Sequence, residues 1–228
     1  MWVTFEIMQT LEKPLADCPR FHSVNHPLVR HKLSHLRDIR TRTPVFRQLV
    51  HELSLLLFYP ATADLVLEPV SLRTPLEPMS GEQLRKEQPP VLVPILRAGL
   101  GMLTAFNEML PQACVGHLGI RRDEKTLKPT VYYQNIPLGH PDRPFILLDP
   151  MLATGGSTSQ AVTELKRQFP GQYRLVSILA APEGVRRLAK DHPDLTIFCA
   201  GLDRQLNEKG YICPGLGDAG DRIFGTVV

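Results

Sequence analysis

Short apolar segments recur along the chain from residue 91 onwards, and they restrict the fold more than any other feature of the sequence. The segments are VLVPI (91–95), VGHLGI (115–120), FILLD (145–149), RLVSILA (174–180) and TIFCA (196–200). Apolar stripes at helical spacing separate most of them, and a further stripe spans Phe46 to Leu57. Continuous apolar runs are typical of strands buried on both faces, and their alternation with helices is typical of a parallel sheet. We therefore predict an α/β fold with a mainly parallel sheet flanked by helices.

Length and composition are those of one globular domain with an appendage. The chain has 228 residues, of which 43% are hydrophobic and 21% charged, and a chain of this length can bury a core without disulfides. Residues 1–24 carry acids early and lack a cationic start followed by an apolar block. We interpret them as an N-terminal extension rather than a signal peptide, and residues 25–228 as the main domain. Residues 60–90, rich in Pro and Glu, are predicted to form an irregular connection with short strands.

The cysteines and the hydropathy pattern favour a cytoplasmic protein. Four cysteines are scattered without a CxxC pair, so neither a disulfide framework nor a zinc site is expected. No apolar run approaches the roughly 20 residues of a membrane span. The histidines in HPLVRHKLSH (26–35) lack a zinc-like spacing and a nearby acid, and we do not predict a metal site there.

The stretch LLDPMLATGGSTSQ (147–160) has the composition of an anion-binding loop. Gly155 and Gly156 allow close backbone approach, and the helix that they enter offers free N–H groups and a partial positive charge. The stretch has no Lys or Arg, and the chain has no GxxxxGK[ST] string, so we expect a monophosphate here, with Asp149 accepting hydrogen bonds from sugar hydroxyls. An ordinary turn with a Ser or Thr cap is the alternative. The expected hydroxyl donors are Thr154, Ser157, Thr158 and Ser159.

Two other segments could face the same anion. Arg97 follows the strand at 91–95, and an arginine fork binds phosphate oxygens well, although arginines in loops are commonly surface residues. Residues 120–137 are predicted to form a protruding hairpin with Arg121 and Arg122 near its base, where they could reach a polyphosphate; a solvated hairpin is the alternative. Ligands bind at the carboxyl ends of parallel strands. We therefore expect one cleft to be shared by the three loops that follow the segments at 91–95, 145–149 and 196–200, which carry LRAGLG, PMLATGGSTS and GYICPGLGDAGD.

The string GLGDAG (215–220) matches the GxGxxG pattern of dinucleotide sites, but its context argues against that function. Pro214 precedes it and only eight residues follow it, so no βαβ unit can form there. A glycine-rich segment still exposes backbone N–H and C=O groups. Such a surface suits the edge of a small heterocycle.

Basic residues are concentrated near the N-terminus. Seven Lys or Arg residues and one acid, Asp38, give residues 20–47 a local charge of +6. A solvated face is the simplest interpretation, and a site for a phosphorylated effector or a nucleic acid is the alternative. The seven are Arg20, Arg30, Lys32, Arg37, Arg40, Arg42 and Arg47.

The motifs together resemble one family. The string at 147–160 resembles the phosphoribosyl-diphosphate motif of type I phosphoribosyltransferases. More narrowly, VPILRAGLGM (93–102), DPMLATGGS (149–157), AAPEGV (180–185), HPD (192–194) and GYICPGLGDAGDRIFGT (210–226) resemble the uracil phosphoribosyltransferases, as do HPLVRHKL (26–33) and ATADL (61–65). The resemblance covers about residues 25–226. Two departures are the N-terminal extension and Cys213, which stands where an aliphatic residue is common.

The resemblance implies a reaction, a set of ligands and a set of site residues. The implied reaction converts uracil and phosphoribosyl diphosphate to UMP and diphosphate, with Mg²⁺ held chiefly by the substrate rather than by protein ligands. It also implies a protruding hairpin, a C-terminal hood that binds the base, a homodimer or higher homo-oligomer, and activation of some relatives by GTP. The implied catalytic residues are Arg97, Arg122 and Asp218. Those implied for phosphoribosyl diphosphate are Arg97, Arg122, Asp149, Pro150, Met151, Leu152, Ala153, Thr154, Gly155, Gly156, Ser157 and Asp218, and those for uracil are Ile212, Gly217, Asp218 and Ala219.

Two alternatives remain open at this point. A regulator with the same fold could bind RNA through the basic segment at 20–47 instead of catalysing a reaction. An enzyme with the same chemistry could use another nucleobase.

Overall fold

The predicted parallel sheet is present in the computed structural model, which describes residues 11–86, 89–122, 129–137 and 143–226. Strands β2, β12, β11, β9, β5 and β7 lie side by side in this order and run parallel, while β1 and β8 pair antiparallel at the two edges. The predicted α/β fold is therefore confirmed. The bounds are β1 Leu11–Glu12, β2 Phe21–Val24, β5 Val91–Leu96, β6 Cys114–Val115, β7 His117–Arg122, β8 Pro129–Asn135, β9 Phe145–Leu148, β10 Met151–Leu152, β11 Tyr173–Ala180 and β12 Thr196–Leu202.

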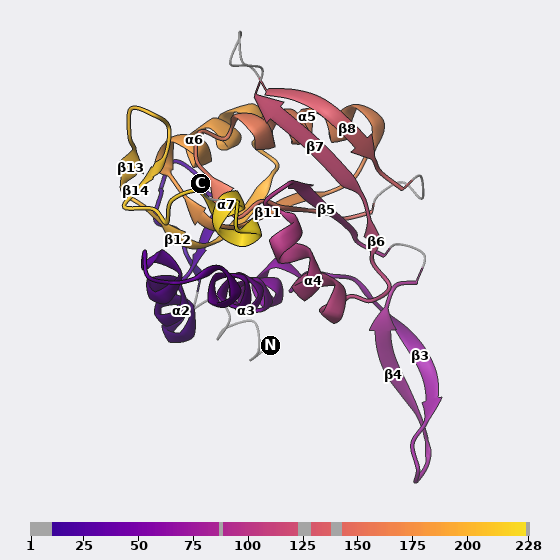
Figure 1. Ribbon diagram of the computed structural model, residues 1–228. Helices are drawn as coiled ribbons and strands as arrows, with labels where there is room; N and C mark the ends of the chain where they lie inside the picture. Colours follow the sequence, from indigo (N-terminus) through magenta and orange to yellow (C-terminus); the bar gives the residue numbers. More distant parts are fainter. Residues whose placement is uncertain (1–10, 87–88, 123–128, 138–142, 227–228) are drawn as a thin grey trace.

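Helices cover both faces of the sheet (Figure 1). Helices α2, α3, α4 and α7 pack on one face, and α5 and α6 pack on the other. Pro27 begins α2, where its missing N–H costs nothing, and the preceding residue, His26, accepts a hydrogen bond from the N–H of Leu28 through its ring nitrogen. The bounds are α2 Pro27–Arg37, α3 Thr43–Ala61, α4 Leu100–Met109, α5 Gly156–Gln168, α6 Pro182–Asp191 and α7 Ala219–Phe224.

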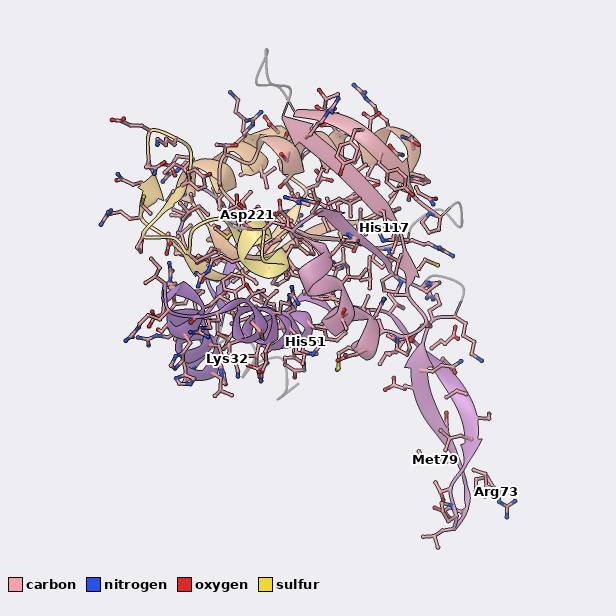
Figure 2. All side chains as sticks on the ribbon, in the orientation of Figure 1. Lys32, His51, Arg73, Met79, His117 and Asp221 are labelled. Carbon is pink, nitrogen blue, oxygen red and sulfur yellow. The ribbon has the colours of Figure 1, made fainter. Side chains whose placement is uncertain are left out.

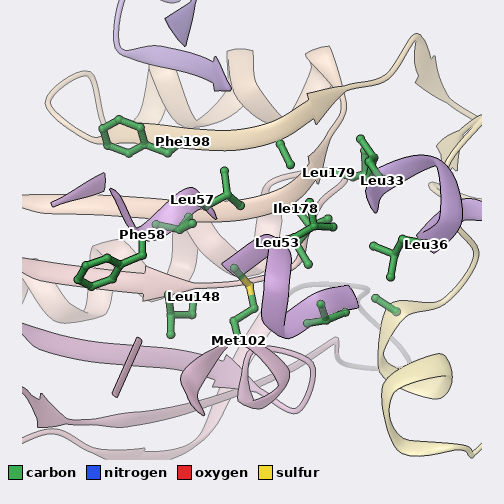
Figure 3. Close-up of a cluster of buried hydrophobic side chains, with 14 of the residues drawn as sticks. Leu33, Leu36, Leu53, Leu57, Phe58, Met102, Leu148, Ile178, Leu179 and Phe198 are labelled. Atoms are coloured by element: carbon green, nitrogen blue, oxygen red, sulfur yellow. The ribbon is translucent and has the colours of Figure 1, made fainter. Parts of the chain in front are cut away.

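Each strand supplies side chains to both layers because consecutive side chains of a strand point to opposite faces. In β5, Leu92 packs into the cluster beneath α2, α3 and α4, and Val93 packs into the cluster beneath α5 and α6. Figure 3 shows the first cluster, where Leu53 of α3 lies with Leu148 of β9 and Ile178 of β11. Burial on both faces explains why these strands read as continuous apolar runs rather than as an alternation.

The connections diverge between β5 and β9. From β5 the chain passes through α4 to β7, and from β9 it passes through α5 to β11 on the other side. Because β5 and β9 are neighbours, the loops that leave their carboxyl ends part and open a crevice, which is where open α/β sheets bind ligands. Arg97 and Asp149 are the residues that directly follow these two strands.

The N-terminal segment takes part in the sheet. β2 pairs with β12, with Phe21 opposite Ile197, and both Cys18 and Phe21 are buried in the core. The described part of the proposed extension, from residue 11 to residue 24, therefore forms an edge of the sheet. Residues 1–10 lie outside the described part of the chain, and the division into extension and main domain remains a proposal.

Residues 60–90 are more regular than the sequence suggests. β3 Leu67–Arg73 and β4 Pro78–Leu84 pair in an antiparallel hairpin, with Leu67 opposite Leu84 and Arg73 opposite Pro78. The hairpin extends away from the body, with Arg73 and Met79 towards its far end (Figure 2). The strands expected in this part are therefore present, but they form one regular hairpin rather than an irregular connection, because backbone pairing rather than burial of apolar side chains organises it.

The hairpin expected at 120–137 is present as β7 and β8, but its two arginines lie elsewhere than predicted. His117 pairs with Asn135 at the base, whereas Arg121 and Arg122 lie at the opposite end of β7. The placement of both arginines near the base is therefore wrong. Since β7 runs parallel to β5, its end is at the same edge of the sheet as Arg97. The tip, residues 123–128, and the side chain of Arg122 lie outside the described part.

None of the helices in the described ranges has the length and apolar composition that a membrane span requires.

Candidate active site

Three loops converge on one cleft at the carboxyl edge of the sheet, as predicted. The cleft has a wider lobe of about 430 Å³ and a narrower lobe of about 230 Å³. Residues 209–212 and 217–220 line only the wider lobe, and Asp149 with residues 154–158 lines only the narrower one. Four residues line both lobes and join them, namely Arg97, Ala98, Met151 and Ala153.

Close backbone packing shapes the anion-binding loop. Gly155 has φ of 71°, which is the left-handed region, and a Cβ there would lie 2.9 Å from the carbonyl oxygen of Gly184. Both the backbone conformation and the contact require glycine. α5 then begins at Gly156, and residues of its first turn line the narrower lobe. The unpaired N–H groups and the positive end of the helix dipole are therefore at this lobe, as an anion requires.

The hydroxyl groups of this loop have different hydrogen-bond partners. The Thr158 hydroxyl donates to Asp149 Oδ2 at 3.2 Å, and Thr154 Oγ1 accepts from the Gly156 N–H at 3.4 Å. Ser159 was counted among the donors for the anion, but it is buried and its hydroxyl donates to Asp191 at 2.7 Å. That expectation is wrong because each residue turns by about 100° around the helix, and position 159 faces α6.

Asp149 is an unusual carboxylate at the floor of the narrower lobe. Burial raises its pKa to about 6, and hydrogen bonds from the Met151 N–H and the Thr158 hydroxyl oppose the rise only in part. Among the described residues no cation forms an ion pair with it within 4.0 Å. Its oxygens therefore remain available to hydroxyl donors of a ligand.

Arg97 projects into the cleft with few restraints. Its side chain is 63% exposed, Nη2 lies 3.9 Å from Asp221 Oδ1, and its guanidinium lies 6.0 Å from the centre of the Phe224 ring. An exposed ion pair at this distance contributes little stability, so an incoming polyanion can replace it. Asp218 also lines the cleft, and its Oδ1 accepts from the Asp221 N–H at 3.0 Å as the cap of α7.

The other predicted site residues fall into two groups. Ile212, Gly217, Asp218 and Ala219 all line the wider lobe, and Gly217 has φ of 81°. Pro150 and Leu152 are buried and line neither lobe. The Pro150 carbonyl instead accepts from the N–H groups of Ile178 and Leu179, which holds the loop on β11.

Two arginines that the sequence did not single out hold the glycine-rich loop. Arg37 forms an ion pair with Asp203 at 2.5 Å, and its Nη1 donates to the Gly215 carbonyl at 2.8 Å. Arg222 donates to the carbonyls of Leu36 and Leu216 at 2.9 and 2.8 Å. No local signal in the sequence could identify these partners, because Arg37 and Asp203 are separated by 166 positions.

A second missed feature is the turn at 207–210 before β14 Ile212–Cys213, which pairs with β13 Gln205–Leu206. Asn207 Oδ1 accepts from the N–H groups of Lys209 and Tyr211 at 3.0 and 2.9 Å. This places Lys209 and Tyr211 at the rim of the wider lobe. Asn and Gly in LNEKG are turn residues, and this was the available signal.

The basic segment at 20–47 is largely engaged in intramolecular contacts. Besides Arg37, Lys32 pairs with Glu52 at 2.6 Å, Arg40 pairs with Asp38 at 2.6 Å, and Arg47 donates to the Ile223 carbonyl at 2.5 Å. Much of its charge therefore contributes to the fold, and only the remainder forms an unpaired basic surface.

Comparison with known proteins identifies close relatives. The family model described as uracil phosphoribosyltransferase matches residues 23–226. The uracil phosphoribosyltransferase of Macrococcus caseolyticus is 49% identical over 207 residues, which are 91% of this chain and 99% of that protein. The solved structure of the AQ2163 protein from Aquifex aeolicus is 40% identical, with a TM-score of 0.85 over 91% of this chain and 99% of that one. The adenine phosphoribosyl transferase of Trypanosoma brucei, 10% identical with a TM-score of 0.53 over 91% and 90% of the two chains, shares the fold alone.

The raised pKa of Asp149 predicts how its amide variant will behave. Asp149→Asn retains an acceptor for Met151 and removes a desolvated charge, so it should stabilise the ligand-free protein by about 1–3 kcal/mol at pH 7.5. The carboxyl is protonated in both the folded and the unfolded chain below about pH 4, so the gain should appear as pH rises from about 4 to about 6. Urea unfolding of both proteins at pH 4 and pH 7.5 measures it. A variant no more stable than wild type at pH 7.5 would contradict the assignment of a desolvated charge.

Proposed function

This chain belongs to the uracil phosphoribosyltransferase family, and we propose that it transfers the phosphoribosyl group of phosphoribosyl diphosphate to uracil, giving UMP and diphosphate. The observation that carries the proposal is the two-lobed cleft, with an anion-binding helix start in one lobe and a backbone-lined surface in the other. A sugar phosphate and a small planar base fit these two lobes. Arg97 lines both lobes, so its guanidinium can reach a diphosphate at their junction.

The narrower lobe supports binding of the ribose 5-phosphate part of the donor. The backbone from residue 154 to residue 158 faces the 5′-phosphate, and Asp149 accepts from the ribose hydroxyls. Displacement of diphosphate at C1 develops positive charge on the sugar and negative charge on the leaving group. The chain's contribution is alignment and electrostatic stabilisation by Arg97 and, from the end of β7, Arg122. No covalent nucleophile is required.

The donor set of the cleft fits a magnesium ion that arrives with the substrate. Within the described residues, no three His, Cys, Asp or Glu side chains gather into a metal-binding group. Asp149 is followed by Pro150, which has no side-chain donor, and Asp218 already caps α7. Mg²⁺ bound to the diphosphate would neutralise charge on the leaving group, and the protein would hold it mainly through the substrate oxygens.

The wider lobe supports recognition of uracil by backbone groups. Uracil presents two carbonyl acceptors on either side of an N–H donor. Ile212 and residues 217–219 can oppose this edge with N–H, C=O and N–H groups, and Asp218 also reaches the ribosyl donor. Cytosine replaces one acceptor with an amine donor, so a buried N–H of the protein would be left unpaired.

The β3–β4 hairpin supports a homodimer or a higher homo-oligomer. Leu67, Leu72, Leu76 and Met79 on it are between 41% and 91% exposed. An isolated two-stranded hairpin with exposed apolar side chains has little stability of its own, and a second subunit would cover these side chains.

The four cysteines are free thiols, which supports the proposed cytoplasmic location.

GTP activation remains a prediction, and the basic residues on α2 and before α3 are its candidate site. Arg30 and Arg42 are exposed, and their side chains form no hydrogen bond or ion pair with another described residue. The alternative of an RNA-binding regulator is weaker, since three of the seven basic side chains that suggested it form intramolecular ion pairs and Arg47 donates to a backbone carbonyl.

The first prediction concerns the base. Uracil should be used about 10⁴-fold better than cytosine, because the mismatched edge leaves buried groups unpaired. Gly217→Val should raise the KM for uracil more than the Kd for phosphoribosyl diphosphate, since a β-branched residue cannot adopt φ of 81° without moving the loop. Steady-state kinetics on a panel of uracil, cytosine, xanthine, hypoxanthine and orotate measures the first effect and tests the function as a whole.

A matched control for Gly217 is Gly225→Val. Gly225 also has a positive φ of 69° but caps the far end of α7 and lines neither lobe. If both variants raise the KM for uracil equally, or if cytosine turns over comparably with uracil, the C-terminal loop does not recognise the base.

The second prediction concerns Arg97. Arg97→Ala should lower kcat/KM by about 10²-fold or more, which is the order of loss when one donor to the charge of the transition state is removed. Arg167→Ala is the control, since Arg167 is similarly exposed, at 68%, but pairs with Glu164 on α5. Near wild-type kinetics of the Arg97 variant would exclude this residue from the mechanism.

The third prediction concerns the effector. GTP should increase the rate when phosphoribosyl diphosphate is below saturation, and an Arg30→Ala, Arg42→Ala double variant should lose this response. Initial rates over a GTP titration measure it. A flat response of the wild type at both low and moderate salt would rule out activation.

A further inference from the structure

The anion-binding loop contains no cation of its own, but helix α6 supplies one. Arg187 reaches from α6 to the start of α5, where its Nη1 lies 3.2 Å and its Cζ 3.7 Å from the point that a Cβ of Gly156 would occupy. Thr154 Oγ1 lies 3.6 Å from the same point. The guanidinium, the Thr154 hydroxyl and the first turn of α5 therefore lie close together. Thr154 and the first turn of α5 line the narrower lobe, and Arg187 stands behind them without lining it.

The guanidinium has no strong partner at this position. Its only hydrogen bond within the described residues joins Nε to Asp191 Oδ2 at 3.5 Å, and that oxygen also accepts from the Ser159 hydroxyl at 2.7 Å. The terminal nitrogens donate to no described residue. They also lie beside the N-terminus of α5, which carries a partial positive charge. Two positive groups side by side favour an anion bound between them.

We propose that Arg187 binds the 5′-phosphate of the substrate, as a cation contributed from outside the loop that cradles it. The proposal rests on the proposed function, because it assumes a sugar 5-phosphate in the narrower lobe. Arginine can present two parallel N–H donors to a phosphate, and such charge-assisted bonds are stronger than those of the hydroxyls alone. Gly156 makes this possible, because a side chain there would displace the guanidinium.

The neighbouring arginine provides a matched control. Arg186 is on the same helix and carries the same charge, but its Nε donates to Asp17 at 2.8 Å, towards the N-terminal segment. Arg186→Gln and Arg187→Gln change the net charge equally and shorten the side chain by the same amount. A difference between them therefore reports where the charge acts rather than how much charge the protein has.

The experiment measures binding of UMP, the product that carries the same 5′-phosphate, by calorimetry at pH 7.5 and pH 5.5. Arg187→Gln should raise the Kd of UMP about 5–20-fold at pH 7.5, and Arg186→Gln should leave it within about 2-fold. The second pKa of a phosphomonoester is about 6, so the effect of Arg187→Gln should be smaller at pH 5.5, where less of the dianion is present. Arg187→Lys, which keeps the charge but loses the fork, should fall between wild type and the glutamine variant.

Two results would overturn the proposal. Equal losses in the two glutamine variants would mean that only general charge matters. A loss in Arg187→Gln that is the same at both pH values would mean that Arg187 supports the loop structurally and does not contact the phosphate. Turnover of uracil by the wild type tests the proposed function separately, so failure of one idea does not hide failure of the other.

Discussion

The ion pair between Arg37 and Asp203 connects three distant parts of the chain on which the cleft depends. Arg37 ends α2, Asp203 follows β12, and both hold Gly215, which offers its carbonyl to Arg37 and its N–H to Asp203 at 2.8 Å each. Asp203 is only 7% exposed, and a buried carboxylate without partners is strongly unfavourable. Arg37 and Asp203 therefore have all of these hydrogen bonds only when the glycine-rich loop packs against them. Conversely, the pair fixes the loop on the sheet edge.

The narrower lobe is held by a different kind of interaction. Among the residues that the structure describes, none forms an ion pair with its loop, and the loop instead packs directly on the start of α6. A Cβ on Gly184 would lie 2.3 Å from the carbonyl oxygen of Ala153, so the two backbones approach as closely as glycine allows. This explains why the string PEGV at 182–185 belongs with the site although none of its residues lines a lobe. Ala153 also lines both lobes, so the two halves of the cleft share one wall.

The sequence predicted what depends on local pattern and missed what depends on distant partners. Strands such as 91–95 were recognisable because burial on both faces makes them continuously apolar. At 67–84 short strands were expected, but their bounds and their pairing in one hairpin were not recognisable, because most of the side chains there are exposed. Arg37 was assigned to a solvated surface and Arg222 was not singled out, since a count of charges cannot show that their partners are on other elements. The anion-binding loop was recognisable from Gly155 and Gly156, but the inward turn of Ser159 needed the helix geometry.

The difference in how the two ends of the cleft are held matches what each end has to do. Discrimination between bases that differ in one donor or acceptor requires groups that do not move, because a loop that adapts could satisfy the wrong base as well. Gly215 and Leu216 in the glycine-rich loop, which we propose to bind the base, accordingly bond to Arg37, Asp203 and Arg222. Arg97 instead has one ion-pair contact at 3.9 Å and a largely exposed side chain. A leaving diphosphate moves away from the sugar as the bond breaks, and a weakly restrained arginine can follow it. Tight restraint of the base loop and loose restraint of Arg97 are therefore both consistent with a transferase whose selectivity and charge stabilisation lie in separate segments.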